Sequence, residues 1–347
     1  MQKKLPLKKK CHKDYNLYFL YTLKLRFSKF NIWNPMLLRN ILILITFILL
    51  SIVIVFFAQK SITSAYDNAI SKFSSNLLND LQIEERYAQD IGFVVLTTIS
   101  ENPKIINSLK KHDRSIAIKE LNKIVAEYKA KTNIKNLKIH IHTADMKSFI
   151  RHWKLNKYGD DLSGFRKTVV KVHDTKESVF AFEIGRIGLT LRTLLPIEDD
   201  GVYLGSIEFI QQFNQVPAQF EKHGNQYLLL MDKSYLNIAK YLTTSPDMEN
   251  YKVSSKYFNK DFLEESRKID FNILRSNKFY FSNMYMFVYK DIIDVNNNIV
   301  GMHLLAIPSK KVNELIENDK NTIMLSSLFG FVIMLLILLL MYFMNKK

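Results

Sequence analysis

Two long apolar runs lie near the ends of the chain, at Ile41–Ala58 and Ile323–Phe343, and neither contains Asp, Glu, Lys or Arg. Each run is close to the roughly 20 residues that a helix needs to cross the hydrocarbon core of a membrane. The region between them has mixed polarity. The pattern therefore predicts two transmembrane helices, over 40–59 and 321–344, with most of the chain on one side of the membrane.

Helical periodicity continues directly after the first apolar run. From Ser61 to about Ser100 the sequence has no proline, and apolar residues recur at helical spacing. Such a stalk helix carries one apolar stripe, which requires a partner helix. Two shorter helices are expected at Lys104–Lys111 and Arg114–Lys129. We assign the stalk and these packing helices to residues 60–133.

The period then changes to two, which is typical of half-buried strands. Glu198-Asp199-Asp200-Gly201 is a hairpin turn signal between two of the strands. Helices followed by an antiparallel sheet in meander order indicate a PAS-type module over 134–222, with helices on one face of the sheet and a ligand cavity on the other. The strands expected there are Leu137–His142, Phe149–His152, Val179–Ile184, Leu189–Pro196 and Val202–Phe209, with a short helix at Asp161–Val172.

A second PAS-like module is predicted over 223–319. In both modules a polar turn is followed by two apolar residues, a glycine and alternating apolar positions, and the two glycines are Gly205 and Gly301. The fold class is thus α+β, with two stacked modules that contain antiparallel sheets. The second module is expected to have strands at Tyr227–Met231, Phe279–Tyr289 and Ile299–Ile307, helical stretches around Asp247–Tyr251 and Asp261–Ser266, and a final helix at Val312–Asn318.

The charge distribution predicts the orientation in the membrane. The net charge is +16, and the segment before Ile41 holds ten Lys or Arg residues against a single acid, Asp14. Lys346 and Lys347 follow the second apolar run. Basic residues stay on the cytoplasmic side. We therefore expect the basic segment 1–39 and the tail 345–347 to be cytoplasmic, and the central region to be periplasmic or otherwise extracytoplasmic, on a bacterial inner (plasma) membrane.

The N-terminal segment admits other interpretations. A nucleic-acid-binding arm fits poorly, because the basic segment leads straight into an apolar run, and no nucleic-acid partner is predicted. A cleaved signal peptide ending near Ala58 is an alternative to an uncleaved anchor, but Phe56 stands where a small residue is expected. Residues 1–35 have the composition of a translated upstream region, so Met36 is an alternative start. Cys11 is the only cysteine, so no intramolecular disulfide can form.

The stretch His140–Phe209 resembles the membrane-distal module of double Cache domains, in the subgroup found on two-component sensor kinases and chemoreceptors. The resemblance implies recognition of a small molecule outside the cytoplasm, a homodimer, and a signal sent as a small shift between membrane helices. It is carried by His140-Ile141-His142, Ser148-Phe149-Ile150-Arg151, Lys157-Tyr158-Gly159-Asp160-Asp161-Leu162-Ser163-Gly164-Phe165-Arg166, Phe182-Glu183-Ile184-Gly185-Arg186-Ile187-Gly188-Leu189, Leu191-Arg192 and Tyr203-Leu204-Gly205-Ser206-Ile207-Glu208-Phe209.

The chain departs from this family after the second apolar run. Sensor kinases and chemoreceptors continue into a cytoplasmic linker and an output domain, whereas three residues follow here. We expect the output domain to be missing through truncation of a receptor, or to be supplied by another chain such as a separate kinase or chemoreceptor.

Arginines are the leading candidates for ligand binding. Converging guanidinium groups in an apolar cavity suit a carboxylate or phosphate, through paired hydrogen bonds. The alternative is that the arginines brace loops by pairing with Asp160, Asp161, Glu183 or Glu208. Asp161 either caps the helix that follows it or lines the mouth of the pocket. The predicted ligand-binding residues are Arg151, Arg166, Arg192, Arg186, His142, Tyr158, Asp161 and Glu183.

Histidines raise the question of a metal. His140 and His142 point the same way on one predicted strand, and His152 lies on its neighbour, a spacing that can bind zinc. No cysteine is available and no tight acid cluster is evident in the sequence. We therefore predict no metal site and no cofactor, with histidine acting as a hydrogen-bond donor on the cavity face.

Catalysis has little support, because the sequence contains neither a nucleophile elbow nor a phosphate-binding loop. The chain is predicted not to be an enzyme. The sequence favours a membrane-anchored extracytoplasmic sensor module that binds a small, anionic ligand and passes a conformational signal across the membrane. The alternative is a structural or vestigial envelope scaffold without a ligand.

Overall fold

The structure is a computed structural model that describes residues 35–132, 134 and 137–344. The predictions for the basic segment 1–34, for Cys11, for residue 133 and for the tail 345–347 lie outside the described residues. The chain divides into two compact units, residues 67–316 and residues 1–66 with 317–347. We describe each unit by itself.

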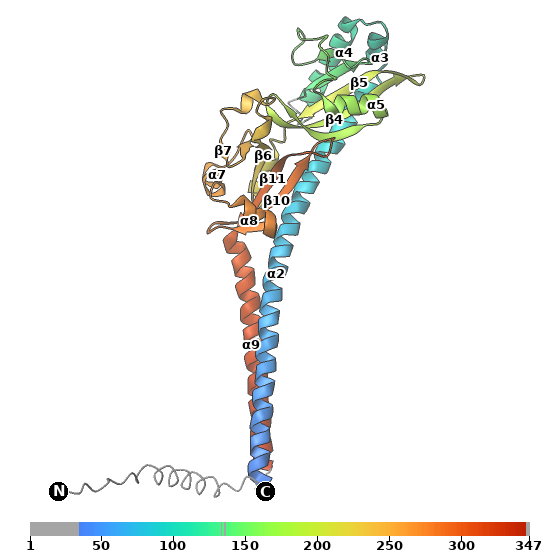
Figure 1. Cartoon of the computed structure of the whole chain (residues 1–347). Coiled ribbons are helices and arrows are strands. Elements are labelled where there is room, and N and C mark those ends of the chain that lie inside the picture. Colours follow the sequence, from blue (N-terminus) through green and yellow to red (C-terminus); the bar gives the residue numbers. More distant parts are fainter. Residues whose placement is uncertain (1–34, 133, 135–136, 345–347) are drawn as a thin grey trace, which may run out of the picture. The chain divides into compact units, whose positions relative to one another are not determined.

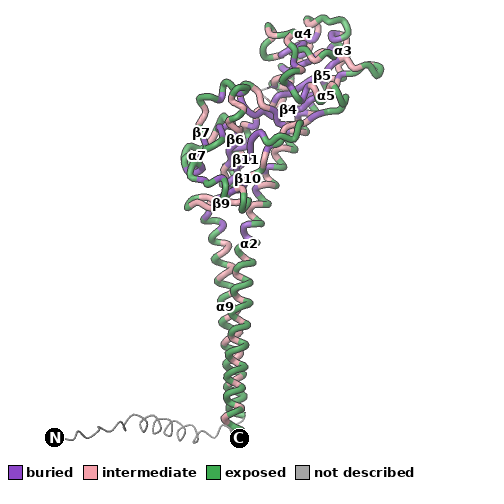
Figure 2. The backbone as a smooth tube through the Cα atoms, in the orientation of Figure 1, coloured by how far each residue is buried: buried purple, intermediate pink, exposed green. Residues whose placement is uncertain are grey.

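Within the described residues, two helices are long and apolar enough to cross a membrane, judged by length and composition. They are α2 (Pro35–Ser100) and α9 (Ser309–Met344). The most apolar window of each helix has none of its residues buried, and Figure 2 shows these segments as largely exposed. Large exposed apolar side chains along both helices, such as Ile52, Phe56, Leu328 and Leu336, suit a hydrocarbon environment.

The first module of the 67–316 unit begins with two short helices that pack on each other. They are α3 (Pro103–Lys110) and α4 (Arg114–Lys131). Both are capped at the N-terminus, because the Asn102 side chain accepts a hydrogen bond from the Lys104 N–H and the Asp113 side chain accepts one from the Ser115 N–H.

The first sheet has five antiparallel strands in the order β2-β1-β5-β4-β3. Strand β1 therefore lies between β2 and β5, an arrangement that a simple meander does not contain. The turn at Asp200-Gly201 has φ of 48° and 77°, as a two-residue hairpin requires. The strands are β1 (Ile139–Thr143), β2 (Ser148–Arg151), β3 (Val179–Gly185), β4 (Gly188–Asp199) and β5 (Val202–Gln211).

The two faces of this sheet are covered differently. Ile139 and Ile141 of β1 and Ile207 of β5 pack against apolar residues of α2, α3 and α4. The other face is covered by α5 (Lys167–Thr175), whose valines contact β3 and β4 (Figure 1).

The helix predicted at Asp161–Val172 is wrong in its first half. Asp161 instead forms an isolated bridge with Lys147, and its carboxylate accepts a hydrogen bond from the Ser163 N–H at 2.9 Å. Such local side-chain bonds compete with helix formation, so α5 starts only at Lys167.

The second sheet has six strands in the order β7-β8-β6-β11-β10-β9. The helix predicted around Asp247–Tyr251 is wrong, because Glu249 has a φ of 47° in a tight turn between β7 and β8. The strand predicted at Phe279–Tyr289 is interrupted, since the Ser282 hydroxyl accepts hydrogen bonds from the N–H groups of Met284 and Tyr285. The strands are β6 (Gln226–Asp232), β7 (Asp247–Met248), β8 (Tyr251–Val253), β9 (Phe279–Phe281), β10 (Tyr285–Ile293) and β11 (Ile299–Pro308).

Short helices complete the second module. The helix predicted at Asp261–Ser266 is present as α7. The others were not predicted, and each has fewer than eight residues. These others are α6 (Val216–Lys222), η1 (Lys233–Tyr235), η2 (Lys240–Leu242) and α8 (Phe271–Asn277), whereas the predicted α7 comprises Lys260–Ser266.

A single hydrophobic core joins the two modules. Phe182 and Leu191 of the first sheet belong to the same buried cluster as Tyr227 and Met231 of the second. Leu77 and Leu81 of α2 complete this cluster. The α+β class and the two antiparallel modules predicted from the sequence are thus confirmed.

Gly205 and Gly301 occupy matching positions in the two modules, as the sequence pattern shared by the modules suggests. Gly205 lies on β5 beside β1, and a Cβ atom there would lie 2.0 Å from the His142 carbonyl oxygen. Gly301 lies on β11 beside β6, and a Cβ atom there would lie 2.1 Å from the Leu230 carbonyl oxygen. Only glycine allows the neighbouring strand to come this close.

Gly205→Ala is expected to lower the free energy of unfolding by about 1–3 kcal/mol, because the strands must separate to admit a methyl group. The φ of 151° at Gly205 adds strain for any L residue. Gly164→Ala is the matched control, since a Cβ atom there meets nothing within 4 Å, and its effect should stay within about 0.5 kcal/mol. Denaturation of the full-length chain in detergent measures both, and equal effects would contradict the register of β1 and β5.

Candidate functional site

Six buried charged or titratable side chains on the α5 face of the first sheet form one connected set of contacts. Each of these residues is more than nine-tenths buried. Moving an ionised side chain out of water costs several kcal/mol unless partners compensate. A set of buried ions is therefore unusual in a protein core. We call it the charged cluster, and its members are His140, His142, Arg166, Glu183, Arg192 and Glu208.

Strand register brings the cluster together. His140 of β1 is the direct cross-strand neighbour of Glu208 of β5, and His142 is the neighbour of Ser206. Successive side chains of a strand alternate between faces. The histidines therefore point away from the helices that cover Ile139 and Ile141.

Two arginines and two glutamates form interlocked ion pairs. The Arg166 Nε donates to Glu183 Oε2 at 2.8 Å, and its Nη2 donates to Glu208 Oε1. The Arg192 Nη1 donates to Glu208 Oε1 at 2.6 Å, and its Nε lies 3.0 Å from Glu183 Oε2. Two positive and two negative charges thus balance.

Glu183 also connects the cluster to α5. Its Oε1 accepts a hydrogen bond of 2.9 Å from the main-chain N–H of Thr168 in the first turn of the helix. Carboxylates stabilise the N-terminal turn of a helix, so Glu183 joins the sheet to the element that covers it.

The charged cluster keeps the Glu208 carboxylate ionised. Burial by itself would raise the pKa of Glu208, but the positive charges of Arg166 and Arg192 outweigh it and hold that pKa well below its usual range. Burial lowers the pKa of Arg166, and the charges of Glu208 and Glu183 more than reverse this effect. Both ions are thus kept charged by each other.

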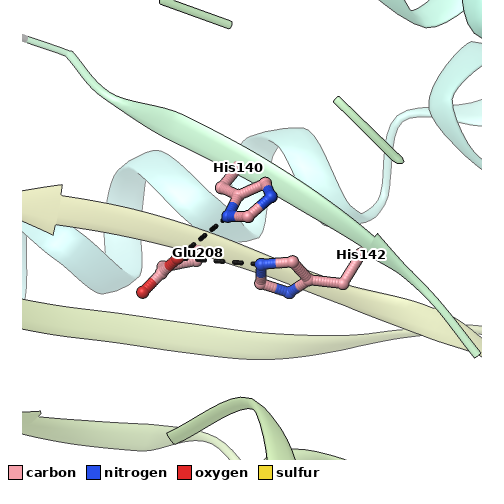
Figure 3. A group of neighbouring side chains, drawn as sticks. All are labelled: His140, His142 and Glu208. Carbon is pink, nitrogen blue, oxygen red and sulfur yellow. Dashed lines mark ion pairs between the residues drawn. The ribbon is translucent and has the colours of Figure 1, made fainter. Parts of the chain in front are cut away.

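The histidines face the second oxygen of Glu208. His140 Nδ1 lies 3.4 Å from Glu208 Oε2, and His142 Nε2 lies 3.7 Å from the same atom (Figure 3). The other ring nitrogen of each is hydrogen-bonded, His140 to the Ser148 hydroxyl and His142 to the Ser206 hydroxyl, both at 2.8 Å. Burial lowers the pKa of both histidines, and well below the usual value for His140, so both rings are neutral at pH 7.

Arg151 was predicted to bind ligand and is found in an ion pair. Its guanidinium makes a bidentate contact with Asp160, at 2.5 and 2.7 Å, and a third bond to the Lys157 carbonyl oxygen at 3.0 Å. These bonds brace the loop between β2 and α5, which is the alternative role raised for it above.

The remaining predicted residues lie outside the charged cluster. Tyr158 is exposed, and the Arg114 guanidinium lies 3.5 Å from the centre of its ring. Asp161 is exposed and closes the turn at Ser163 rather than capping α5. Arg186 is exposed in the turn between β3 and β4, where its carbonyl oxygen accepts a bond from the Tyr241 N–H.

Of the predicted residues, the structure therefore brings together Arg166, Arg192, Glu183 and His142. Sequence reasoning gave Glu208 only a bracing role and did not include Ser148 or Ser206 in the site. The sequence Tyr203–Phe209 contains a pattern that could have identified Ser206 and Glu208 as site residues. Alternation along a strand places both side chains on one face, in an otherwise apolar strand.

The comparisons with known proteins bear on the whole region. A family described as the double sensory domain of two-component sensor kinases matches residues 70–312, which is more than half of the chain. The chain belongs to this double Cache family. It is a family of sensory ligand-binding domains. No curated protein matches the chain.

Two sensory domains are among the solved structures to which the chain is similar. The sensory domain of the Campylobacter jejuni chemoreceptor Tlp3 with isoleucine bound is 14% identical, with a TM-score of 0.46, and the match covers 73% of this chain and 98% of that one. The sensor domain of the Vibrio cholerae histidine kinase DctB is 10% identical, with a TM-score of 0.42, and the match covers 70% and 98%.

Proposed function

We propose that this double Cache protein is a membrane-anchored extracytoplasmic sensor whose first module binds a small anionic ligand at the charged cluster. The observation that carries the proposal is the burial of six titratable groups on the sheet face beneath α5. Apolar residues of similar volume would pack there at a lower cost. A cluster of perturbed titratable groups in one place is characteristic of functional sites.

The two buried arginines are the groups that we expect to meet the ligand. Their contacts with Glu183 and Glu208 use Nε and Nη2 of Arg166 and Nε and Nη1 of Arg192. A guanidinium has five N–H donors, so each arginine keeps N–H groups for a carboxylate or phosphate. His142 of the charged cluster, Arg151 of β2, and the exposed residues Tyr158, Asp161 and Arg186 of the same module remain proposed contributors.

The signal would pass through α2. This helix supplies Val95 and Leu96 to the core beneath the first sheet, and Leu77 and Leu81 to the core shared by both modules. The same helix contains the first apolar run. A ligand that binds one arrangement of a homodimer more tightly than another shifts the population of the two.

The proposed orientation places both termini in the cytoplasm of a bacterium and residues 67–316 outside the inner membrane. It rests on the excess of Lys and Arg before Ile41 and after Phe343. The two apolar helices and membership of a sensory family fit such a membrane protein.

A scaffold role without a ligand is the second candidate. The observation that favours it is the internal pairing of Arg166 and Arg192, which is the arrangement that bracing alone would produce. Ligand binding separates the two candidates.

A thermal-shift screen of the full-length chain in detergent, against organic acids, amino acids, amines and phosphates, tests the proposal. One anionic class is expected to raise the unfolding midpoint, with a stabilisation of about 2.7 kcal/mol at a concentration 100 times the Kd. Arg166→Lys keeps the charge but loses the paired hydrogen-bond geometry, so it should reduce the shift. The absence of any shift, or an undiminished shift in Arg166→Lys, would contradict the proposed site.

A further inference from the structure

The geometry points to a binding site for a divalent transition metal of the zinc class at His140 Nδ1, His142 Nε2 and Glu208 Oε2. Each of the three residues is buried and offers one ligand atom, and these atoms all lie within 4.8 Å of one another. Figure 3 shows the three side chains together. The sequence predicted no metal because no acid cluster was evident. Glu208 is distant in sequence, and only the pairing of β1 with β5 brings it beside the two histidines.

The distances fit metal ligands better than hydrogen bonds. Among the residues that the structure describes, none forms a hydrogen bond with any of these three atoms. Buried polar atoms rarely lack a partner. Zinc lies about 2.0–2.2 Å from nitrogen and oxygen ligands, so neighbouring ligand atoms of a tetrahedron are roughly 3.3–3.5 Å apart. The oxygen-to-nitrogen distances of 3.4 and 3.7 Å are close to this spacing.

Both histidines are held in the orientation that a metal ligand needs. The ring nitrogen that points away from Glu208 is bonded to Ser148 in one case and to Ser206 in the other. Such outer bonds fix the orientation of each ring. A serine hydroxyl can accept a hydrogen bond from the outer N–H, and in that tautomer the inner nitrogen presents its lone pair to a metal. A neutral imidazole is the form that binds metal.

Three protein ligands leave a fourth position open. The arginine and glutamate charges of the cluster already balance, so a bound M²⁺ would add two uncompensated positive charges close to Arg166 and Arg192. An anion in the fourth position would offset them. The metal would thereby supply the attraction for an anionic ligand, and in this respect the inference rests on the proposed sensory function. Metal binding itself does not depend on it.

The test is a titration of the metal-free, full-length chain in detergent with Zn²⁺ and with Co²⁺. Cys11 and His12 are replaced by Ser and Gln in every sample, so that they do not bind the added metal. We expect one Zn²⁺ per chain by calorimetry and elemental analysis, and the intense visible bands of four-coordinate Co²⁺.

Two ligand variants keep the outer hydrogen bonds while removing the metal ligand. The amide of His140→Gln can still reach Ser148, and the amide of His142→Asn can still reach Ser206. Each should weaken Zn²⁺ binding by more than about 100-fold, and Ser206→Ala by about 10–100-fold. His173→Gln is the matched control, because His173 also lies beside a carboxylate, that of Asp174, but on the surface, and it should change nothing.

Each outcome decides the question. No stoichiometric Zn²⁺ binding, a six-coordinate Co²⁺ spectrum, or equal affinity in His140→Gln and His142→Asn would overturn the metal site. Far-ultraviolet circular dichroism of the metal-free variants shows whether they fold, and Ser206→Ala tests the site if they do not. Zn²⁺ binding without any response to the organic panel would overturn the anionic-ligand proposal while leaving the metal site intact.

Discussion

Arg192→Met is expected to lower the free energy of unfolding of the sensory region by about 3–5 kcal/mol, because it removes one partner from a buried charge network. Arg192 is 4% exposed and contacts both Glu183 and Glu208. Without it, two buried carboxylates share the single positive charge of Arg166. Methionine fills a similar volume, so the loss reflects charge rather than a cavity. Denaturation of the full-length chain at pH 7 measures the effect.

Two further variants separate this explanation from a general sensitivity to mutation. Arg186→Met removes an exposed arginine of the adjacent turn and should change stability by less than about 0.5 kcal/mol. Adding Glu183→Gln to Arg192→Met restores one positive and one negative charge, and it should recover part of the loss. If Arg192→Met stayed within about 1 kcal/mol of the unmodified chain, the charged cluster would not be a closed network of ion pairs.

Acidification is expected to destabilise the chain through His303, a buried residue at the centre of the second sheet. Burial, together with the positive charge of Lys290, lowers the pKa of His303 to about 3. The unfolded chain binds this proton near pH 6.5, so the contribution to stability is complete above that pH and is lost as the pH falls toward 3. At about 1.36 kcal/mol per pH unit, the loss between pH 6.5 and pH 4 is about 3 kcal/mol.

The groups around His303 set the sign of this effect. The Tyr227 hydroxyl lies 2.7 Å from Nδ1, and Glu85 Oε1 lies 3.4 Å from Nε2. Glu85 would favour a charged histidine, but the Lys290 ammonium is 2.5 Å from its other oxygen and neutralises much of its field. Desolvation of a group that is 1% exposed therefore prevails.

The measurement compares unfolding at several pH values for the unmodified chain and for His303→Asn, which cannot titrate. The variant should lose about 3 kcal/mol less than the unmodified chain between pH 6.5 and pH 4. His112→Asn, at an exposed position with a φ of 54° that asparagine tolerates, should keep the original pH dependence. An equal or larger loss in His303→Asn would mean that Glu85 dominates and that His303 is charged in the folded chain.

Periodicity predicted much of the fold because it reports which side of an element is buried. The alternation of Ile139 and Ile141 with His140 and His142 correctly separated the helix-packed face from the polar face. The sequence pattern shared around Gly205 and Gly301 identified two strands in which the neighbouring strand approaches the glycine too closely for a side chain. Strand neighbours are set by long-range pairing, however, so the position of β1 beside β5 could not be read from local patterns.

The charged cluster was predicted only in part for the same reason. Arg166, Arg192, Glu183 and His142 were named from their chemistry, but their partners depend on cross-strand register. Glu208 lies opposite His140 only through the β1–β5 pairing. Local turn chemistry explains the other misses, since the Asp161 carboxylate and the positive φ of Glu249 both override a helical pattern.

The most direct test of the central claim, that ligand binds at the charged cluster, uses the fluorescence of Trp153. Its ring centre lies 5.9 Å from that of His140, and replacing the other tryptophan, Trp33, by Phe leaves Trp153 as the only tryptophan, which is excited selectively at the red edge of the absorption band. Each compound of the organic acid, amino acid, amine and phosphate panel is titrated into this full-length variant. We predict that the compound that raises the unfolding midpoint also changes Trp153 emission, saturably and with the same Kd. A compound that raises the midpoint but leaves Trp153 emission unchanged would place the ligand elsewhere and contradict the account.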